Sequence, residues 1–341
     1  MLQPAYLPSL DGLRGVSIII VLIFHILLVS GYAAFNGGFG VEIFFVISGF
    51  IITTLLLKEK FKKQDISLRK FYIRRFLKII PVAYLYLLVI TLLNFYYKYV
   101  KPTDILSAAL FIKNTNIIPT GLEKVTGHFW SLSVEEQFYL FFPFILKKSI
   151  RAYVMVILLL LTIIPGLLYF DNRSQGIFSA EGMHNFVDLF RFITPILIGS
   201  LCAILVFKGV IAKNIYPKTL VTNLLVMGLA YVLYQDPVFG YYNYYHTFFS
   251  SGLVALLIVN NISHSNDLFF KFLNSKVLVT IGLASYSIYV WQQLFLLQTP
   301  WSHAFKYSGS IWLNLVALLI ISFCSYYFVE RKLAVFKKRF K

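Results

Sequence analysis

The sequence predicts an all-α membrane protein: a polytopic bundle of about ten transmembrane helices with both termini in the cytoplasm. Of its 341 residues, 59% are hydrophobic and only 13% are charged, whereas a soluble domain averages about 45–50% apolar and about 25% charged residues. Long uncharged stretches recur along the chain, and about 20 consecutive apolar residues are enough to cross a bilayer. This composition excludes a soluble enzyme, a disordered chain and a nucleic-acid-binding module.

Ten stretches have the length and composition of membrane-spanning helices. The first lacks the basic start and the cleavage site of a signal peptide, so we interpret it as part of the fold. The longest connection is Tyr97–His128, and we therefore expect a single domain over residues 1–341 with no appended soluble domain. The predicted helices are Leu13–Ser30, Gly38–Leu57, Ile79–Tyr96, Phe129–Leu146, Ala152–Phe170, Asp188–Phe207, Leu220–Tyr234, His246–Asn261, Val277–Leu297 and Ile311–Val329.

The distribution of basic residues predicts the orientation. Nine lysines and arginines lie in the connection Lys58–Lys78, and connections rich in Lys and Arg stay on the cytoplasmic side. Alternate connections are also the more basic ones, which predicts an even number of spans. The net charge of +17 is then concentrated on the cytoplasmic face. Such a face can simply set the topology and meet anionic lipid, or part of it can receive a phosphate-bearing ligand from the cytosol.

Two ionisable residues in the first predicted helix stand out because ionisable groups inside spans are costly and indicate function. Arg14 and His25 are eleven residues apart, which corresponds to about 16 Å along a helix axis and nearly the same face. Arg14 is expected near the cytoplasmic surface and His25 near mid-membrane. A neutral imidazole there suits a general base, although a histidine that merely bonds a neighbouring helix is about as common.

Acidic residues occur in two further segments. Glu42 lies near the start of the second predicted helix, where it could orient an imidazole, bind an acceptor hydroxyl or simply face water. In Trp130–Tyr139 the adjacent Glu135 and Glu136 are followed by Gln137. Neighbouring residues on a helix point about 100° apart, so at least one of these polar groups must enter the interior of the bundle or a wet cavity.

A basic cluster, Arg74, Arg75 and Lys78, lies at the cytoplasmic entrance of the third predicted helix. It can be a topological anchor or a clamp for phosphate or pyrophosphate, which arginine forks bind well. The two cysteines, Cys202 and Cys324, both lie in apolar runs and offer no disulfide framework or zinc site. The histidines show no metal-ligand spacing, so no metal is expected.

Segments in a fixed order along Leu7–Leu333 resemble the membrane-bound acyltransferase 3 family, which includes O-antigen, peptidoglycan and exopolysaccharide O-acetyltransferases. Glu42 replaces the family's usual aspartate, Lys78 the second arginine of an arginine pair, and Lys332 a proline, while Gln292 stands where a histidine is frequent. The resembling segments are Leu10–His25 with its arginine, ten residues and histidine, Gly38–Phe50, Phe71–Ile79, Trp130–Pro143, Tyr286–Gln292 and Phe328–Glu330.

The resemblance implies transfer of an acyl group, usually acetyl, from acyl-coenzyme A to a hydroxyl of a cell-surface or lipid-linked glycan, in the bacterial cytoplasmic membrane. Acetyl-coenzyme A is a co-substrate, and no tightly bound cofactor is expected. His25 would act as general base or carry the acyl group transiently, with Arg14, Glu42, Glu135 and Glu136 as catalytic partners. Arg14 would also help Arg74, Arg75 and Lys78 bind the donor. The substrate cavity would be lined by Asp11, Ser48, Trp130, Ser131, Gln137, Tyr286, Tyr289, Gln292 and Glu330.

Two other functions are compatible with the sequence. An acyl-group exporter that serves a separate transferase would share the donor site but lack the acceptor site. A secondary transporter also carries ionisable residues at mid-membrane, but the chain shows no inverted repeat and no paired broken helices.

Overall fold

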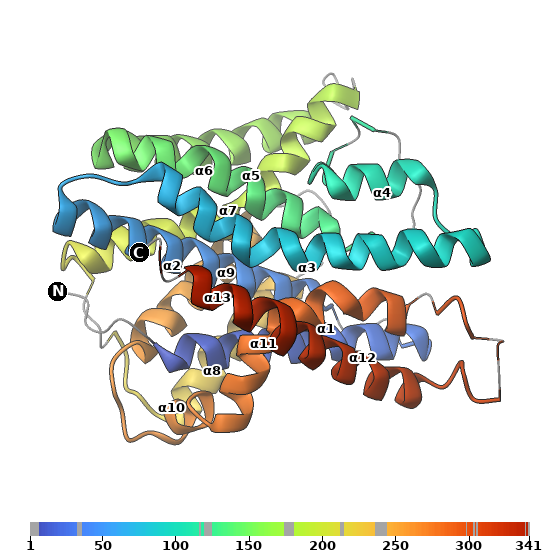
Figure 1. Ribbon diagram of the computed structural model, residues 1–341. Helices are drawn as coiled ribbons and strands as arrows, with labels where there is room; N and C mark the ends of the chain where they lie inside the picture. The colour runs from blue at the N-terminus through green and yellow to red at the C-terminus, as the bar shows by residue number, and fades with distance from the viewer. Residues whose placement is uncertain are drawn as a thin grey trace. The chain divides into compact units, whose positions relative to one another are not determined.

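The computed structural model describes residues 7–32, 36–115, 117–118, 125–173, 181–211, 215–235, 244–297, 299–302, 304, 306–337 and 339, and every regular element in these residues is a helix. Figure 1 labels the α-helices along the chain. They are α1 Pro8–Val29, α2 Gly38–Lys63, α3 Leu68–Tyr97, α4 Pro102–Ala109, α5 Phe129–Lys148, α6 Ile150–Arg173, α7 Glu181–Phe207, α8 Leu220–Gln235, α9 Tyr244–Asn261, α10 Leu268–Leu273, α11 Lys276–Leu296, α12 Ile311–Ser325, the π-helical turn η1 Tyr326–Glu330 and α13 Arg331–Lys337.

Each of the ten predicted helices is present. Within the described residues, five helical segments are long and apolar enough to cross a membrane: α1, α2, α3, α11 and the continuous run Ile311–Lys337. Shorter apolar helices occupy Ile150–Ile163, Phe192–Phe207 and Leu220–Gln235. The all-α membrane fold is therefore confirmed, whereas ten spans and two cytoplasmic termini stay predictions.

Several predicted boundaries are wrong because helices continue beyond their apolar stretches. Helix α3 begins at Leu68 rather than at Ile79, after the Ser67 hydroxyl accepts a hydrogen bond from the Lys70 backbone N–H at 3.4 Å. It ends at Tyr97, and the left-handed backbone of the capping residue Lys98 (φ 47°) terminates it. The basic cluster Arg74–Lys78 consequently lies within a helix.

Two short helices, α4 and α10, lie in segments that the hydropathy pattern assigned to connections. Pro102 occupies the first turn of α4, where its missing N–H costs nothing. Asp267 caps α10, with its carboxylate accepting from the Phe269 N–H at 2.9 Å. The residues that begin these helices, Pro102 and the N-cap Asp267, indicate them better than hydropathy does, because neither helix contains a long apolar run.

The residues divide into two compact units, each drawn from three separate stretches of sequence. The first unit comprises Met1–Ile20, Gly38–Ile66 and Gln137–Leu283, and the second comprises Val21–Gly37, Ser67–Glu136 and Ala284–Lys341. The single domain expected over residues 1–341 stays a prediction.

In the first unit, α2 and α7 approach each other almost backbone to backbone. A Cβ added at Gly49 would lie 2.0 Å from the Ile196 carbonyl oxygen, and one at Gly199 would lie 2.1 Å from the Val46 carbonyl oxygen. Small residues permit this close packing of helices in membranes, where van der Waals contact between helices replaces the hydrophobic effect.

The core of the second unit is organised around Tyr86 of α3, which is fully buried. Its hydroxyl donates to the Val125 carbonyl oxygen at 2.6 Å. Its ring meets the rings of His128 and Trp291 edge-on, with centroid distances of 5.4 and 5.3 Å. Tyr86 thus fixes the entry into α5 against α11.

Candidate active site

His25 of α1 is buried and held by a side-chain amide of α11. Its Nδ1 lies 2.8 Å from Gln292 Oε1, and the two side chains are 8% and 1% exposed. An amide oxygen can only accept, so Nδ1 carries the hydrogen and the lone pair is on Nε2. The expected orienting acid is therefore not the partner seen at Nδ1: this position is occupied by Gln292, a neutral group. The arrangement leaves Nε2 chemically competent as a base or a nucleophile.

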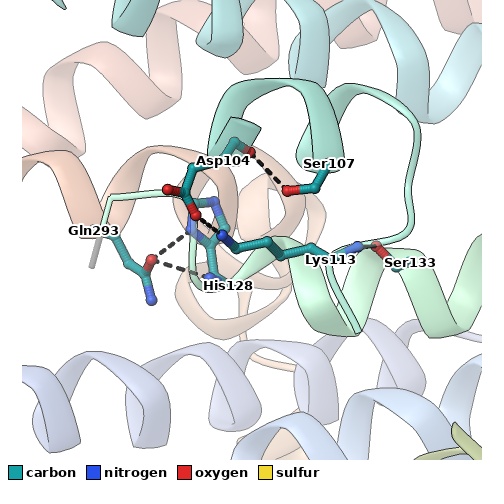
Figure 2. A network of polar contacts seen from close by, with 6 residues as sticks. All are labelled: Asp104, Ser107, Lys113, His128, Ser133 and Gln293. Atoms are coloured by element: carbon teal, nitrogen blue, oxygen red, sulfur yellow. Dashed lines mark hydrogen bonds and ion pairs between the residues drawn. The ribbon is translucent and has the colours of Figure 1, made fainter. Parts of the chain in front are cut away.

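A second histidine, His128, is held in the same way by the next residue of α11. Its Nδ1 lies 2.8 Å from Gln293 Oε1, and the same oxygen accepts from the His128 backbone N–H at 3.0 Å. Figure 2 shows both contacts converging on the Gln293 oxygen. His128 and Gln293 were not predicted from the sequence, because His128 falls at the end of a predicted connection and its partner is 165 residues away.

Further contacts fix His128 in place. The Ser131 hydroxyl donates to the His128 carbonyl oxygen at 3.0 Å and also bonds the Tyr289 hydroxyl at 2.6 Å. The Tyr289 ring lies edge-on to the His128 ring, with centroids 5.6 Å apart. Ser131 and Tyr289, both predicted to line a cavity, thus meet at this histidine.

A charged group of residues lies on the same helices of the second unit. Glu136 on α5 is within electrostatic range of Glu135 and also of Arg75 and Lys78 on α3. Arg75 also packs its guanidinium over the Phe71 ring at 5.6 Å. The structure therefore brings the predicted acidic pair together with Arg75 and Lys78 of the predicted basic cluster.

Tyr286 and Glu330 adjoin this charged group. The Tyr286 hydroxyl donates to the Ile79 carbonyl oxygen at 2.6 Å, and its ring is in electrostatic range of Glu330, Glu136 and Glu135. Glu330, at the end of the π-helical turn, accepts a hydrogen bond from Ser287. Such π turns are frequent at functional sites.

The charged group and the histidines form two levels along the helices. On α3, Lys78 and Tyr86 are eight residues apart, or about 12 Å of helical rise. On α11, Tyr286 and Gln292 are six residues apart, or about 9 Å. The second unit therefore has a charged level and, about two turns away, a neutral level that contains both imidazoles.

Several polar atoms of these levels are buried without a hydrogen-bond partner. Among the described residues they include His128 Nε2, Gln292 Nε2, Trp291 Nε1 and Glu136 Oε1. Buried polar groups are almost always satisfied, and leaving one unsatisfied costs about 1–3 kcal/mol. Three of these four atoms belong to the histidine level, where unsatisfied polar groups are suited to a polar substrate.

The remaining predicted site residues lie in the first unit. Arg14 pairs with Asp11 one turn earlier on α1, at 3.4 Å. Glu42 is buried, and its Oε1 accepts from the hydroxyls of Ser250 and Ser251 on α9, at 2.6 and 2.8 Å. These serines were not predicted. Ser48 is buried on α2, and Gln137 is half-buried on α5.

The second unit gathers twelve of the seventeen predicted site residues on α1, α3, α5, α11 and η1. They are His25, Arg74, Arg75, Lys78, Trp130, Ser131, Glu135, Glu136, Tyr286, Tyr289, Gln292 and Glu330.

One further ion pair shapes the segment before α5. Lys113 pairs with Asp104 of α4, and both side chains are nearly inaccessible, at 6% and 0%. The Lys113 backbone N–H also donates to the Ser133 hydroxyl at 3.2 Å (Figure 2). In the part of the chain that the structure describes, no three His, Cys, Asp or Glu residues are grouped so as to hold a metal ion.

The fold and the site define an integral membrane protein with two buried histidines. Each histidine is held by a glutamine side chain, and a charged level lies about two helical turns away. The family model described as an acyltransferase domain matches residues 7–330, and the chain belongs to this acyltransferase 3 family. The family resemblance read from the sequence is thereby confirmed.

Relatives named as O-acetyltransferases support this assignment. The chain is 28% identical over 316 residues to the O-acetyltransferase OatA of Staphylococcus aureus strain NCTC 8325, covering 85% of this chain and 51% of OatA. It is 29% identical over 360 residues to SACOL0978 of S. aureus strain COL, named as a candidate O-acetyltransferase, covering 95% of this chain and 57% of the relative. The chain thus spans about half the length of the curated relatives it matches. No solved structure matches it.

Proposed function

We propose that the protein is a membrane O-acetyltransferase that moves an acetyl group from acetyl-coenzyme A to a hydroxyl of a cell-surface or lipid-linked glycan. The family and the names of the relatives support the reaction class. The observation that carries the proposal is His25, whose Nδ1–H is bound by Gln292 so that Nε2 is the basic nitrogen. A positioned base of this kind contributes about 10²–10⁴-fold in rate.

The charged level is suited to bind the donor. Arg74, Arg75 and Lys78 supply positive charge for the phosphates of coenzyme A, and guanidinium groups bind phosphate in a bidentate manner. Glu135 and Glu136 lie beside them and keep this level from holding only positive charge. Arg14, which the sequence predicts to help bind the donor, lies in the first unit and pairs with Asp11.

The predicted topology supports a donor site that faces the cytosol. With ten spans and both termini in the cytoplasm, the Lys58–Lys78 segment would lie on that side of the bacterial cytoplasmic membrane. Arg75 lies at its end. The histidine level, about two helical turns further along α3, would then meet an acceptor that arrives from the opposite side.

Two chemical routes use the same residues. In direct transfer, His25 removes the proton from the acceptor hydroxyl as its oxygen attacks the thioester. In a relay, His25 Nε2 attacks the thioester, carries the acetyl group and passes it on. The catalytic roles of Glu42 and Arg14 stay predictions from the sequence, since both residues lie in the first unit.

The test uses purified protein in lipid nanodiscs, where both faces are open, with labelled acetyl-coenzyme A and isolated glycan. We expect wild type to form alkali-labile ester and His25→Asn to lose at least about 100-fold of that rate. Asn is the matched replacement because its amide keeps the donor to Gln292 at the Nδ1 position and removes only Nε2. Ester formation by a folded His25→Asn protein at the wild-type rate would remove His25 from the mechanism. Donor binding without any ester would instead support the exporter.

A further inference from the structure

We propose that His128 is a second catalytic residue, whose Nε2 takes the proton of the acceptor hydroxyl in the step that removes the acyl group from His25. This inference rests on the proposed function and commits it to the relay route. Neither the resemblance nor the sequence pattern assigned His128 a role.

The hydrogen bonds to Gln293 determine which ring nitrogen of His128 carries the hydrogen. The Gln293 Oε1 accepts from the His128 backbone N–H, which can only donate, so the orientation of this amide is fixed. The same oxygen faces His128 Nδ1 at 2.8 Å, so Nδ1 must carry the hydrogen. The lone pair is therefore on Nε2, which makes this nitrogen an acceptor.

The Nε2 atom of His128 is buried and has no hydrogen bond to any residue that the structure describes. The side chain is 2% exposed, and Nε2 has no hydrogen-bond partner among the described residues. Every other polar group of His128 is engaged, since its backbone N–H, its carbonyl oxygen and Nδ1 bond Gln293 and Ser131. A residue that merely packed would be satisfied at both ring nitrogens, so an unfilled acceptor held this rigidly indicates a hydroxyl that binds there.

His128 and His25 are both held by α11. Their Nδ1 atoms are held by consecutive residues of α11, Gln292 and Gln293. Burial lowers the pKa of His128, and the nearby His25 contributes in the same direction. Hydrogen bonding to the Gln293 side chain and to the Val290 backbone opposes this. His128 lies outside the candidate spans, just before α5. The two imidazoles are thus within electrostatic range of each other, and burial favours the neutral form of His128.

A relay through acetyl-His25 needs two neutral imidazoles, whereas direct transfer needs only one. When His25 Nε2 attacks the thioester, a C–N bond forms, the C–S bond breaks and coenzyme A leaves as thiolate. His25 then has no lone pair left with which to act as a base. The acceptor oxygen attacks the acyl carbon, its proton goes to His128 Nε2, the C–O bond forms, and the C–N bond electrons return to His25. The proton finally leaves His128 for the thiolate or for water.

The experiment separates the two half-reactions in nanodiscs. Without acceptor, wild type should exchange labelled coenzyme A into acetyl-coenzyme A, because acetyl-His25 forms reversibly. We expect His128→Asn to retain exchange within about threefold while ester formation on glycan falls at least about 100-fold. Asn preserves the donor to Gln293 and removes Nε2. Hydroxylamine, which needs no base, should still capture the acetyl group from this variant.

Two control variants are measured in the same assays. His25→Asn should lose exchange and ester together, and His264→Asn, at an exposed position, should lose neither. If His128→Asn does not fold, His128→Gln enters the same assays. Three results would overturn the proposal. The first is ester formation by His128→Asn at nearly the wild-type rate, and the second is an equal loss of exchange and ester formation in folded His128→Asn. The third is ester formation by wild type without any exchange. Absence of ester from wild type would contradict the proposed function itself.

Discussion

A buried histidine can act as base or nucleophile only if one ring nitrogen keeps its lone pair, and here glutamine oxygens provide that control. Gln292 and Gln293 fix Nδ1–H of His25 and His128 without adding a charge. A carboxylate in the same place would strengthen the base but would bring an ion into a buried site, where desolvation is costly. Neutral partners therefore suit a site in which two imidazoles must both stay unprotonated.

The role of Gln292 can be tested by removing its acceptor oxygen. Gln292→Leu should lower kcat about 10- to 100-fold with little change in the KM for the donor, because a hydrogen bond worth about 1–3 kcal/mol that orients the base is lost. Gln292→Glu keeps an oxygen at this position and should restore most of the rate. Steady-state kinetics of both variants check this, and an unchanged kcat in Gln292→Leu would contradict the orienting role.

The role of Arg75 is a separate prediction. Arg75→Ala should raise the KM for acetyl-coenzyme A about 10- to 100-fold, the effect of losing a charge-assisted hydrogen bond, and should change kcat less. Arg151→Ala, at an exposed position, is the matched control. If donor affinity is unchanged in Arg75→Ala while the yield of membrane-inserted protein collapses, Arg75 is only a topological anchor.

Sequence reasoning found His25 because an imidazole in an apolar run is unusual by composition alone. It could not find His128, which borders an apolar run. The feature that gives His128 its chemistry is a pair of bonds to Gln293, 165 residues away. Likewise, Ser250 and Ser251 could not be assigned to Glu42, because hydroxyls are common in helices and only packing selects two of them.

At the scale of helices, glycine contacts determine how closely the elements of the first unit pack. Gly199→Ala should lower the unfolding temperature by about 5 °C, because its Cβ would lie 2.1 Å from the Val46 carbonyl oxygen and overpacking costs about 1–3 kcal/mol. Gly228→Ala on α8 is the control, since a Cβ there meets nothing within 4 Å. Thermal unfolding in detergent measures both; equal stability of the two variants would disprove the close contact.

Hydropathy predicted the ten long helices but not the ends of α3 or the short helices α4 and α10. An apolar stretch shows which part of a helix can lie in lipid. The helix itself begins after an N-cap, here Ser67, and ends before a C-cap, here Lys98. The eleven residues from Leu68 to Lys78 are polar enough to read as a connection, yet they continue the helix. This difference matters because it places Arg75 on a rigid element.

At the scale of the whole molecule, the predicted topology sets which substrate reaches which level. Lys63 at the end of α2 and Lys101 before α4 are exposed and should lie on opposite sides of the membrane. In a protein with both native cysteines replaced, a membrane-impermeant maleimide should label Lys63→Cys only in inverted vesicles and Lys101→Cys only in right-side-out vesicles. Labelling of both from one side would refute this orientation.

The central claim is that an acetyl group from a cytosolic donor crosses to an acceptor through His25. The measurement that tests it most directly supplies labelled acetyl-coenzyme A to the cytoplasmic face of sealed, oriented vesicles that contain wild type or His25→Ala. We expect label to enter extracted glycan with wild type and to be absent from glycan with the variant, while donor binding is retained by both. Equal labelling of glycan by folded His25→Ala, or no binding of the donor by wild type, would contradict the claim.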